Sequence, residues 1–184
     1  MLGSTKGEER FEYLRDYVVF DLETTGLSPV SDKIVEIAGV RVRDGNITEE
    51  FSSLVDPQCE IPESAIAVHG ITNEAINNAP GLEEALRKFE KFLGDDVIVG
   101  QNIVRFDMRF MWRDYPEIFG KTLANDYLDT LKISRKLLPN LKSHGTSSLC
   151  DYYGIDQTGA HRALFDCRMT KEIYENLKQG LIYC

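Results

Sequence analysis

The chain has 184 residues, 42% of them hydrophobic and 28% charged, a composition typical of one folded domain. This composition excludes an intrinsically disordered or collagen-like protein. The 21 Lys and Arg residues against 30 Asp and Glu residues give a net charge of −9. Such a charge argues against a generic nucleic-acid binder, because affinity for polyanions comes largely from basic side chains.

The sequence has no apolar run long enough to span a membrane, and its N-terminus lacks an apolar signal core. Its cysteines form no C-x-x-C pair; they are Cys59, Cys150, Cys167 and Cys184. We therefore expect a reduced, cytoplasmic protein with no membrane partner.

The first half of the chain predicts strands. Residues 1–16 are polar and predict a lead-in to one domain over residues 17–184. The near-continuous apolar run over residues 17–24 predicts a strand buried on both faces. Further strands are expected at 33–43 and 46–55, and Asp44-Gly45 between them is a strong hairpin signal. These three strands should therefore run antiparallel.

Beyond residue 80 the apolar residues recur at helical spacing. Helices are expected at 82–93, 106–115, 129–138, 147–153 and 163–178, with a short strand at 97–100. Pro116 should end the second helix, while Gly154 and Gly180 should end the last two. Three antiparallel strands followed by alternating helices and short strands predict an α/β fold, with a mixed sheet flanked by helices.

Two carboxylates interrupt the first predicted strand. Asp21 and Glu23 are two residues apart, so on a strand they project from the same face, near the edge where α/β sheets bind ligands. Gly26 would let the backbone approach a ligand closely. If the strand instead ends at Phe20, both acids are solvated loop residues, and the pair alone does not decide between these interpretations.

Two later segments also contain candidate residues. Asp107 falls in the first turn of an expected helix, where the helix dipole favours an acid without any function, and Asn102 fits either a turn or a ligand contact. His161 and Asp166 lie about 140° apart on one helix, so they share a site only if His161 precedes the helix. Otherwise Arg162 and Asp166 form an ordinary surface pair.

The segments FDLETTGL, VGQNIVRFDMRF and HRALFDC together resemble, in order, the three motifs of the DEDDh (DnaQ-like) 3′–5′ exonucleases. This family has a ribonuclease H-like fold and includes RNase T, together with the proofreading epsilon subunits and exonuclease domains of bacterial DNA polymerase III. The resemblance extends from residue 17 to about residue 178. Gln101 stands where the family often has His, and Cys167 where it often has Ala.

The resemblance implies a metal-dependent 3′–5′ exonuclease that releases nucleoside 5′-monophosphates from single-stranded or frayed DNA, as in proofreading. Two divalent cations, Mg²⁺ or Mn²⁺, would be held by Asp21, Glu23, Asp107 and Asp166, with His161 as general base. By analogy, Asp21 bridges both ions, Glu23 and Asp166 hold the nucleophile-side ion, and Asp107 acts through metal-bound water. Carboxylate oxygens suit such cations, and imidazole suits proton transfer near neutral pH.

The family pattern also assigns contacts with the terminal nucleotide; these residues are Thr24, Thr25, Gly26, His69, Ile71, Asn102 and Phe106. For His69, a turn before a helix capped by Thr72 fits equally well. The stretch from Thr130 to Cys150 has four basic and no acidic residues. It forms either a solvated helical face or a phosphate contact upstream of the cleaved bond.

The expected partners are a single-stranded 3′ end, of DNA rather than RNA, and a DNA polymerase catalytic subunit or domain. Two alternatives stay open: an RNA 3′-end trimming exoribonuclease, and a non-catalytic module that binds a polymerase or nucleic acid. The acidic composition predicts a short footprint and weak unaided affinity, with processivity supplied by a partner.

Overall fold

A computed structural model describes residues 5–182. Cys184, the first four residues of the predicted lead-in and the last two residues of the predicted domain lie outside the described residues. The strands are β1 (Asp16–Thr24), β2 (Ile34–Arg43), β3 (Asn46–Leu54), β4 (Ile98–Gly100) and β5 (Tyr127–Asp129). The helices are α1 (Glu63–His69), α2 (Leu82–Leu93), α3 (Asp107–Phe119), α4 (Thr130–Leu137), α5 (Thr146–Tyr153) and α6 (Ala163–Leu181).

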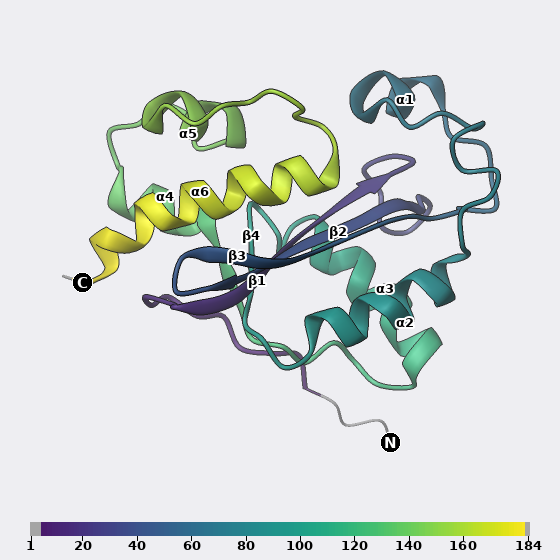
Figure 1. The fold of residues 1–184 in the computed structure, drawn as a ribbon, viewed down its shortest axis with the longest axis horizontal. Coiled ribbons are helices and arrows are strands. Elements are labelled where there is room, and N and C mark those ends of the chain that lie inside the picture. The colour runs from purple at the N-terminus through teal and green to yellow at the C-terminus, as the bar shows by residue number, and fades with distance from the viewer. Residues whose placement is uncertain (1–4, 183–184) are drawn as a thin grey trace.

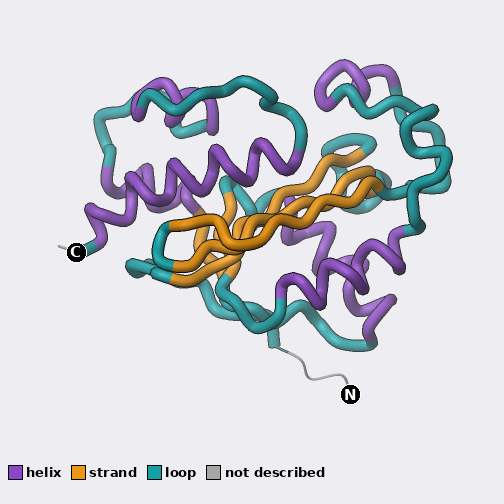
Figure 2. The backbone as a smooth tube through the Cα atoms, in the orientation of Figure 1, coloured by secondary structure: helices purple, strands orange, loops and turns teal. Residues whose placement is uncertain are grey.

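The strands form one mixed sheet in the order β3-β2-β1-β4-β5 (Figures 1 and 2). β1 pairs antiparallel with β2 and β2 with β3, whereas β4 runs parallel to β1 and β5 parallel to β4. Asp44 and Gly45 form the β2–β3 turn with φ angles of 48° and 78°, as the hairpin signal requires. The predicted α/β architecture is confirmed.

Side chains of β1 alternate between two cores, because successive strand residues point to opposite faces. Val19 packs in a cluster with α4, α5 and α6, whereas Val18 and Phe20 pack with α2 and α3. Figure 1 shows these two groups of helices on opposite sides of the sheet. Asp21 and Glu23 continue the row of Val19, so the strand directs both acids toward α6.

Two expected helix ends are wrong. α3 runs through Pro116 to Phe119, because its last turn packs in the core, where the Tyr115 and Phe119 rings lie 4.4 Å apart. α6 runs through Gly180 to Leu181, which is buried. A Cβ at Gly180 would lie 3.0 Å from the Leu137 side chain, so this glycine allows α6 to pack closely on α4 instead of ending the helix.

The other differences concern short elements. α1 and β5 have seven and three residues, too few for a hydrophobic period to identify them. Thr72 begins a turn, not a helix, and its hydroxyl accepts the N–H of Ala75 at 3.3 Å. Gly154 ends α5 in the left-handed conformation, as expected.

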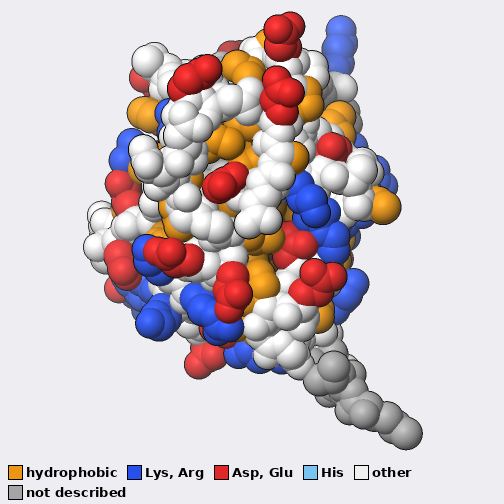
Figure 3. Space-filling model, turned by 90° about the vertical axis from the view of Figure 1, so that its right-hand side faces the viewer, with side chains coloured by type: hydrophobic (Ala, Val, Ile, Leu, Met, Phe, Trp, Pro, Cys, Tyr) orange, Lys and Arg blue, Asp and Glu red, His pale blue; other side chains and the backbone are white. Residues whose placement is uncertain are grey.

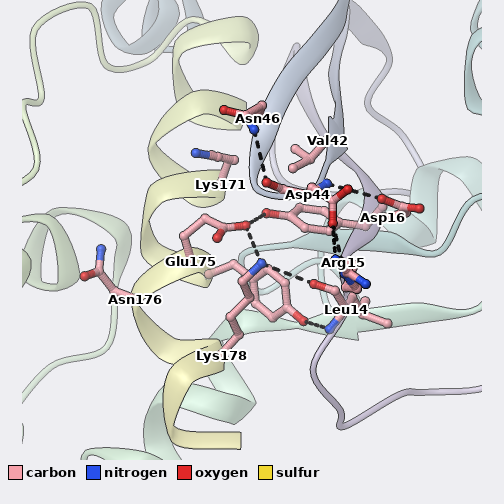
Figure 4. Close-up of polar contacts among 12 residues, drawn as sticks. Leu14, Arg15, Asp16, Val42, Asp44, Asn46, Lys171, Glu175, Asn176 and Lys178 are labelled. Atoms are coloured by element: carbon pink, nitrogen blue, oxygen red, sulfur yellow. Dashed lines mark hydrogen bonds and ion pairs between the residues drawn. The ribbon is translucent and has the colours of Figure 1, made fainter. Parts of the chain in front are cut away.

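The predicted lead-in is bonded to the rest of the fold at its inner end (Figure 4). The N–H of Leu14 donates to the hydroxyl of Tyr174 at 2.9 Å. The Lys178 ammonium, 2% exposed, donates to the Leu14 carbonyl and, at 2.7 Å, to Glu175. These partners offset the cost of burying the charge, and they fix Leu14 on α6. Across residues 5–182, no helix combines the length and the apolar character that crossing a membrane requires.

Candidate active site

Three carboxylates meet where β1 approaches the start of α6. Asp21 and Glu23 both lie within β1, so their interpretation as solvated loop residues is wrong. Asp166 lies in the first turn of α6. One carboxylate oxygen from each of these three residues lies within 4.8 Å of the other two. The alternation of β1 and the packing of α6 together create this cluster.

Asp107 approaches the same place from α3, of which it is the first residue. The side chain is 3% exposed, and its Oδ1 accepts the N–H of Leu22 at 3.1 Å. Leu22 stands between Asp21 and Glu23 in β1, so this bond fixes the fourth carboxylate beside the other three. Asp107 therefore occupies the first helical turn and also lies beside the carboxylates of β1 and α6.

His161 lies on the loop before α6, as a shared site requires. Its φ of 65° is left-handed, a conformation that costs a non-glycine residue about 1 kcal/mol. Burial raises the pKa of the Asp166 carboxylate, whereas the charge of His161 and the backbone N–H groups of His161 and Arg162 act to lower it, so this turn lies close to that acid. The side chain of Arg162 pairs with Glu36 at 2.9 Å, so the expected alternative of an Arg162–Asp166 surface pair is wrong.

One cleft of about 470 Å³ brings the predicted catalytic residues together. Its lining includes all four carboxylates, His161, and two predicted substrate contacts, Asn102 and Phe106. The lining also contains Gln101, Leu131, Thr146 and Ser147. Figure 3 views the molecule from the right-hand side of Figure 1, toward which β1 points, and acidic side chains stand among hydrophobic ones on this hollowed face.

Burial and mutual repulsion raise the pKa values of the four carboxylates. Burial raises the pKa of Asp21 well above its usual range, and the charges of Asp107 and Asp166 add to this effect. Burial is also the largest cause of pKa values of about 8 for Glu23, about 7 for Asp107 and about 6 for Asp166. Four such groups are costly to ionise without a counter-charge. Their oxygen donors and their need for positive charge fit a divalent metal.

A second pocket of about 430 Å³ adjoins this cleft and contains four other predicted contacts. Thr24, Thr25, Gly26 and His69 line it, and Glu23 and Phe106 belong to both cavities. Leu27, Ala65 and Val68 complete much of its apolar wall. Apolar walls beside a carboxylate cluster suit a base or sugar better than a phosphate.

The residues after the β1 carboxylates mainly build their own turn. The Thr24 hydroxyl donates to the Gly26 carbonyl at 2.7 Å, and the Thr25 hydroxyl accepts a backbone N–H at 3.0 Å. A Cβ at Gly26 would lie 2.6 Å from the Asp32 carboxylate. The absence of a side chain at Gly26 therefore makes room for Asp32. The sequence had instead suggested that it makes room for a ligand.

His69 ends α1, and Gly70 caps this helix with a φ of 70°. Burial lowers the pKa of His69, and its Nδ1 accepts the N–H of Ile71 at 3.0 Å, so the ring is oriented by the backbone. Ile71 itself is buried with Val35 and Ile61 in a third core cluster. We expected Ile71 to stack on the substrate, but its side chain packs in the core and lines neither cavity.

The basic stretch after Thr130 is partly engaged within the protein. Lys132 pairs with Glu9 at 2.6 Å, and the Lys136 ammonium lies 4.3 Å from the centre of the Phe11 ring. These contacts favour a structural role for two of the four bases over a phosphate contact.

Sequence reasoning missed two residues beside the cleft. Glu36 is buried in β2 directly opposite Glu23, and the acid inside the apolar run KIVEIAGV was a usable signal. Gln101 donates to the His144 carbonyl at 2.7 Å and so ties the loop before α5 to the end of β4. No sequence pattern indicates such a long-range bond.

Comparisons with known proteins agree with the motifs. The family model of the RNase T exonucleases matches residues 18–174. The DNA polymerase III subunit epsilon of Aquifex aeolicus is 38% identical over 183 residues, 98% of this chain and 90% of that protein. The PolC-type DNA polymerase III of Oceanobacillus iheyensis is 36% identical over 95% of this chain, which spans only 12% of that protein.

Among solved structures, Exonuclease X in complex with 5′ overhanging duplex DNA matches with a TM-score of 0.74 and 27% identity. The match covers 89% of this chain and 92% of that one. The chain therefore belongs to the RNase T family of 3′–5′ exonucleases, with their ribonuclease H-like fold.

Proposed function

We propose that residues 17–184 form the catalytic domain of a metal-dependent exonuclease that removes nucleotides from single-stranded or frayed DNA 3′ ends. The observation that carries this proposal is the cleft that joins the carboxylates of β1, α3 and α6 with His161. The four acids come from three separate elements, and besides burial the charges of Glu23, Asp107 and Asp166 all raise the pKa of Asp21, which supports a shared site.

Asp21, Glu23 and Asp166 are the residues that would hold divalent cations, with Asp107 beside them. Two cations bound here would stabilise both the attacking and the leaving oxygen of phosphodiester hydrolysis. Oxygen donors favour Mg²⁺ or Mn²⁺ over softer metals. In addition to burial, the charges of the other three acids all raise the pKa of Asp21, so Asp21 is the residue that would contact both cations.

His161 would accept the proton of the attacking water. It lines the cleft with the four carboxylates, among them Asp166. Imidazole exchanges protons near neutral pH, and a positioned base of this kind contributes about 10²- to 10⁴-fold to a rate.

The pocket lined by His69 and Val68 would receive the terminal base or sugar, with Phe106 between this pocket and the cleft. DNA is the proposed substrate, since Exonuclease X was solved with 5′ overhanging duplex DNA. The family model carries the name of RNase T, which makes RNA the second candidate. A non-catalytic module is disfavoured because all five predicted catalytic residues are present.

The proposed partner is a DNA polymerase III catalytic subunit or domain, because relatives carry the names epsilon and PolC. With that partner, the exonuclease would proofread newly made DNA 3′ ends, and it would act in the cytoplasm, where the polymerase works.

The test is digestion of matched DNA and RNA oligonucleotides, each with a paired and a mispaired 3′ end. With Mn²⁺ or Mg²⁺ we expect stepwise shortening of DNA from its 3′ end, faster at a mispair, and no reaction in EDTA. Asp21→Asn is the inactive control. Undiminished activity in EDTA, or no activity with either metal, would refute the proposal. Faster cleavage of RNA would favour the second candidate.

A further inference from the structure

Glu36 is a buried carboxylate that the proposed chemistry does not use. In β2 it continues the row of Ala38 and Val40, which pack in the core beneath α6, because alternate strand residues share a face. Glu36 is 1% exposed, and the strand register places it opposite Glu23. An acid buried beside another acid is costly unless a cation and hydrogen bonds compensate it.

Most of the compensation comes from one turn, at the start of α6; the Ser52 hydroxyl on β3 adds a longer bond to Glu36 Oε1, at 3.4 Å. Arg162 donates from Nη2 to Glu36 Oε1 at 2.9 Å and from Nε to Oε2 at 3.2 Å. The N–H of Ala163, the first residue of α6, donates to the same Oε2 at 3.1 Å. Arg162 is the N-cap residue but provides no side-chain cap. A carboxylate from β2 therefore caps this helix.

The capped turn contains the residues on which the proposed reaction depends. His161 directly precedes Arg162 and has a left-handed backbone, and Asp166 follows in the first turn of α6. Glu36 consequently holds Arg162 and Ala163, which lie between His161 and Asp166, against the sheet. Since β1 and β2 are paired, Glu36 links this turn to the strand that carries Asp21 and Glu23.

We propose that Glu36 is a positioning residue that fixes the start of α6 and so places His161 and Asp166 against the carboxylates of β1. This inference rests on the proposed roles of those residues. A misplacement of about 1 Å can reduce a catalytic rate by about 10²-fold. Loss of Glu36 should therefore lower kcat, with little change in KM because Glu36 lines neither cavity.

A second ion pair on the same helix provides a matched control. Arg168 donates to both oxygens of Glu50 on β3, at 2.8 Å and 2.7 Å. This pair also joins α6 to the sheet, but it lies almost two turns beyond the capped turn, and its carboxylate is more exposed than that of Glu36. Glu50→Gln weakens a sheet–helix contact without touching the residues around His161.

The experiment compares Glu36→Gln, Glu36→Ala and Glu50→Gln with the wild type, using a single-stranded DNA oligonucleotide at a temperature where melting curves show each to be folded. We expect Glu36→Ala to lower kcat by about 10- to 100-fold, with KM within about twofold. Glu36→Gln should lose less, because its amide oxygen still accepts the N–H of Ala163. Glu50→Gln should keep the wild-type kcat.

Amide hydrogen exchange by NMR provides a readout that does not depend on catalysis. Glu36→Ala should speed exchange at Ala163 and shift the His161 ring resonances, whereas Glu50→Gln should do neither. Wild-type kcat in Glu36→Ala, or equal losses in Glu36→Ala and Glu50→Gln, would overturn the proposal. So would loss of metal binding in Glu36→Gln with unchanged resonances over residues 161–166, since Glu36 would then be a metal ligand.

The two proposals fail separately. If the wild type degrades no substrate, the proposed function is refuted, while the exchange comparison still tests the anchoring of α6. If the wild type is active and Ala163 exchanges equally fast in all variants, the positioning role is refuted and the proposed function stands.

Discussion

The N–H of Leu22 donates to the carboxylate of Asp107 at 3.1 Å, so the first residue of α3 is bonded to the β1 residue between Asp21 and Glu23. This bond makes Asp107 both a structural acceptor and a candidate ligand, and the two functions are separable by substitution.

Asp107→Asn keeps an oxygen that can accept the Leu22 N–H but removes the charge. We expect a large loss of exonuclease activity, with metal-free stability unchanged or slightly higher, because an acid with a raised pKa is removed. Asp107→Ala leaves a buried N–H unpaired, which should cost about 1–3 kcal/mol of unfolding free energy. Urea unfolding in EDTA measures the difference, and equal stabilities would contradict the structural role of the bond.

The carboxylate cluster should make metal-free stability fall as pH rises. The pKa values of Asp166, Asp107 and Glu23, about 6, 7 and 8, are raised above those of the unfolded chain, near 4. Between these limits the unfolded chain releases protons that the folded protein retains, so the free energy of unfolding decreases with pH from about 4 to about 8. The Tm in EDTA should therefore drop over this range, and Asp166→Asn should flatten the drop. A Tm that rises toward pH 8 would contradict the pKa directions.

Divalent metal should reverse this trend. Mn²⁺ or Mg²⁺ supplies the missing positive charge and competes with protons for the same oxygens. The increase in Tm on adding metal should consequently be larger at pH 8 than at pH 5.5, and Asp21→Asn should abolish it. Calorimetry at both pH values tests this, and identical melts with and without metal would count against a metal site.

His161→Gln should separate turnover from metal binding. Loss of a general base is expected to lower kcat by about 10²-fold or more, while the calorimetric affinity for Mn²⁺ stays near that of the wild type. His144→Gln is a suitable comparison, because the ring of His144 contacts Ser134 at 3.1 Å and has no proposed role in the reaction. Near-normal turnover in His161→Gln would exclude its role as a base.

The sequence predicted elements and residues whose signals are local. The alternating cores of β1, the Asp44-Gly45 turn and the spacing of the three motifs depend on neighbouring residues, and the structure places Asp21, Glu23, Asp107, Asp166 and His161 in one cleft.

The missed features depend on contacts between distant segments. Pro116 stays inside a helix because the turn around it packs in the core, and Gly180 does so because α6 packs closely on Leu137. Gly26 leaves space for the Asp32 carboxylate, and Glu36 is paired with Arg162. Of these contacts, only that of Glu36 has a recognisable signal in the sequence, which is an acid inside an apolar strand.

The cleft draws its acids from three elements that follow one another along the sequence, β1, α3 and α6. During synthesis, a chain that has not yet produced and docked α6 lacks Asp166 and His161, even when the three-stranded meander is complete. The proposed hydrolysis therefore requires α6 to be made and docked, so a chain that stops before α6 should not degrade nucleic acid through this site.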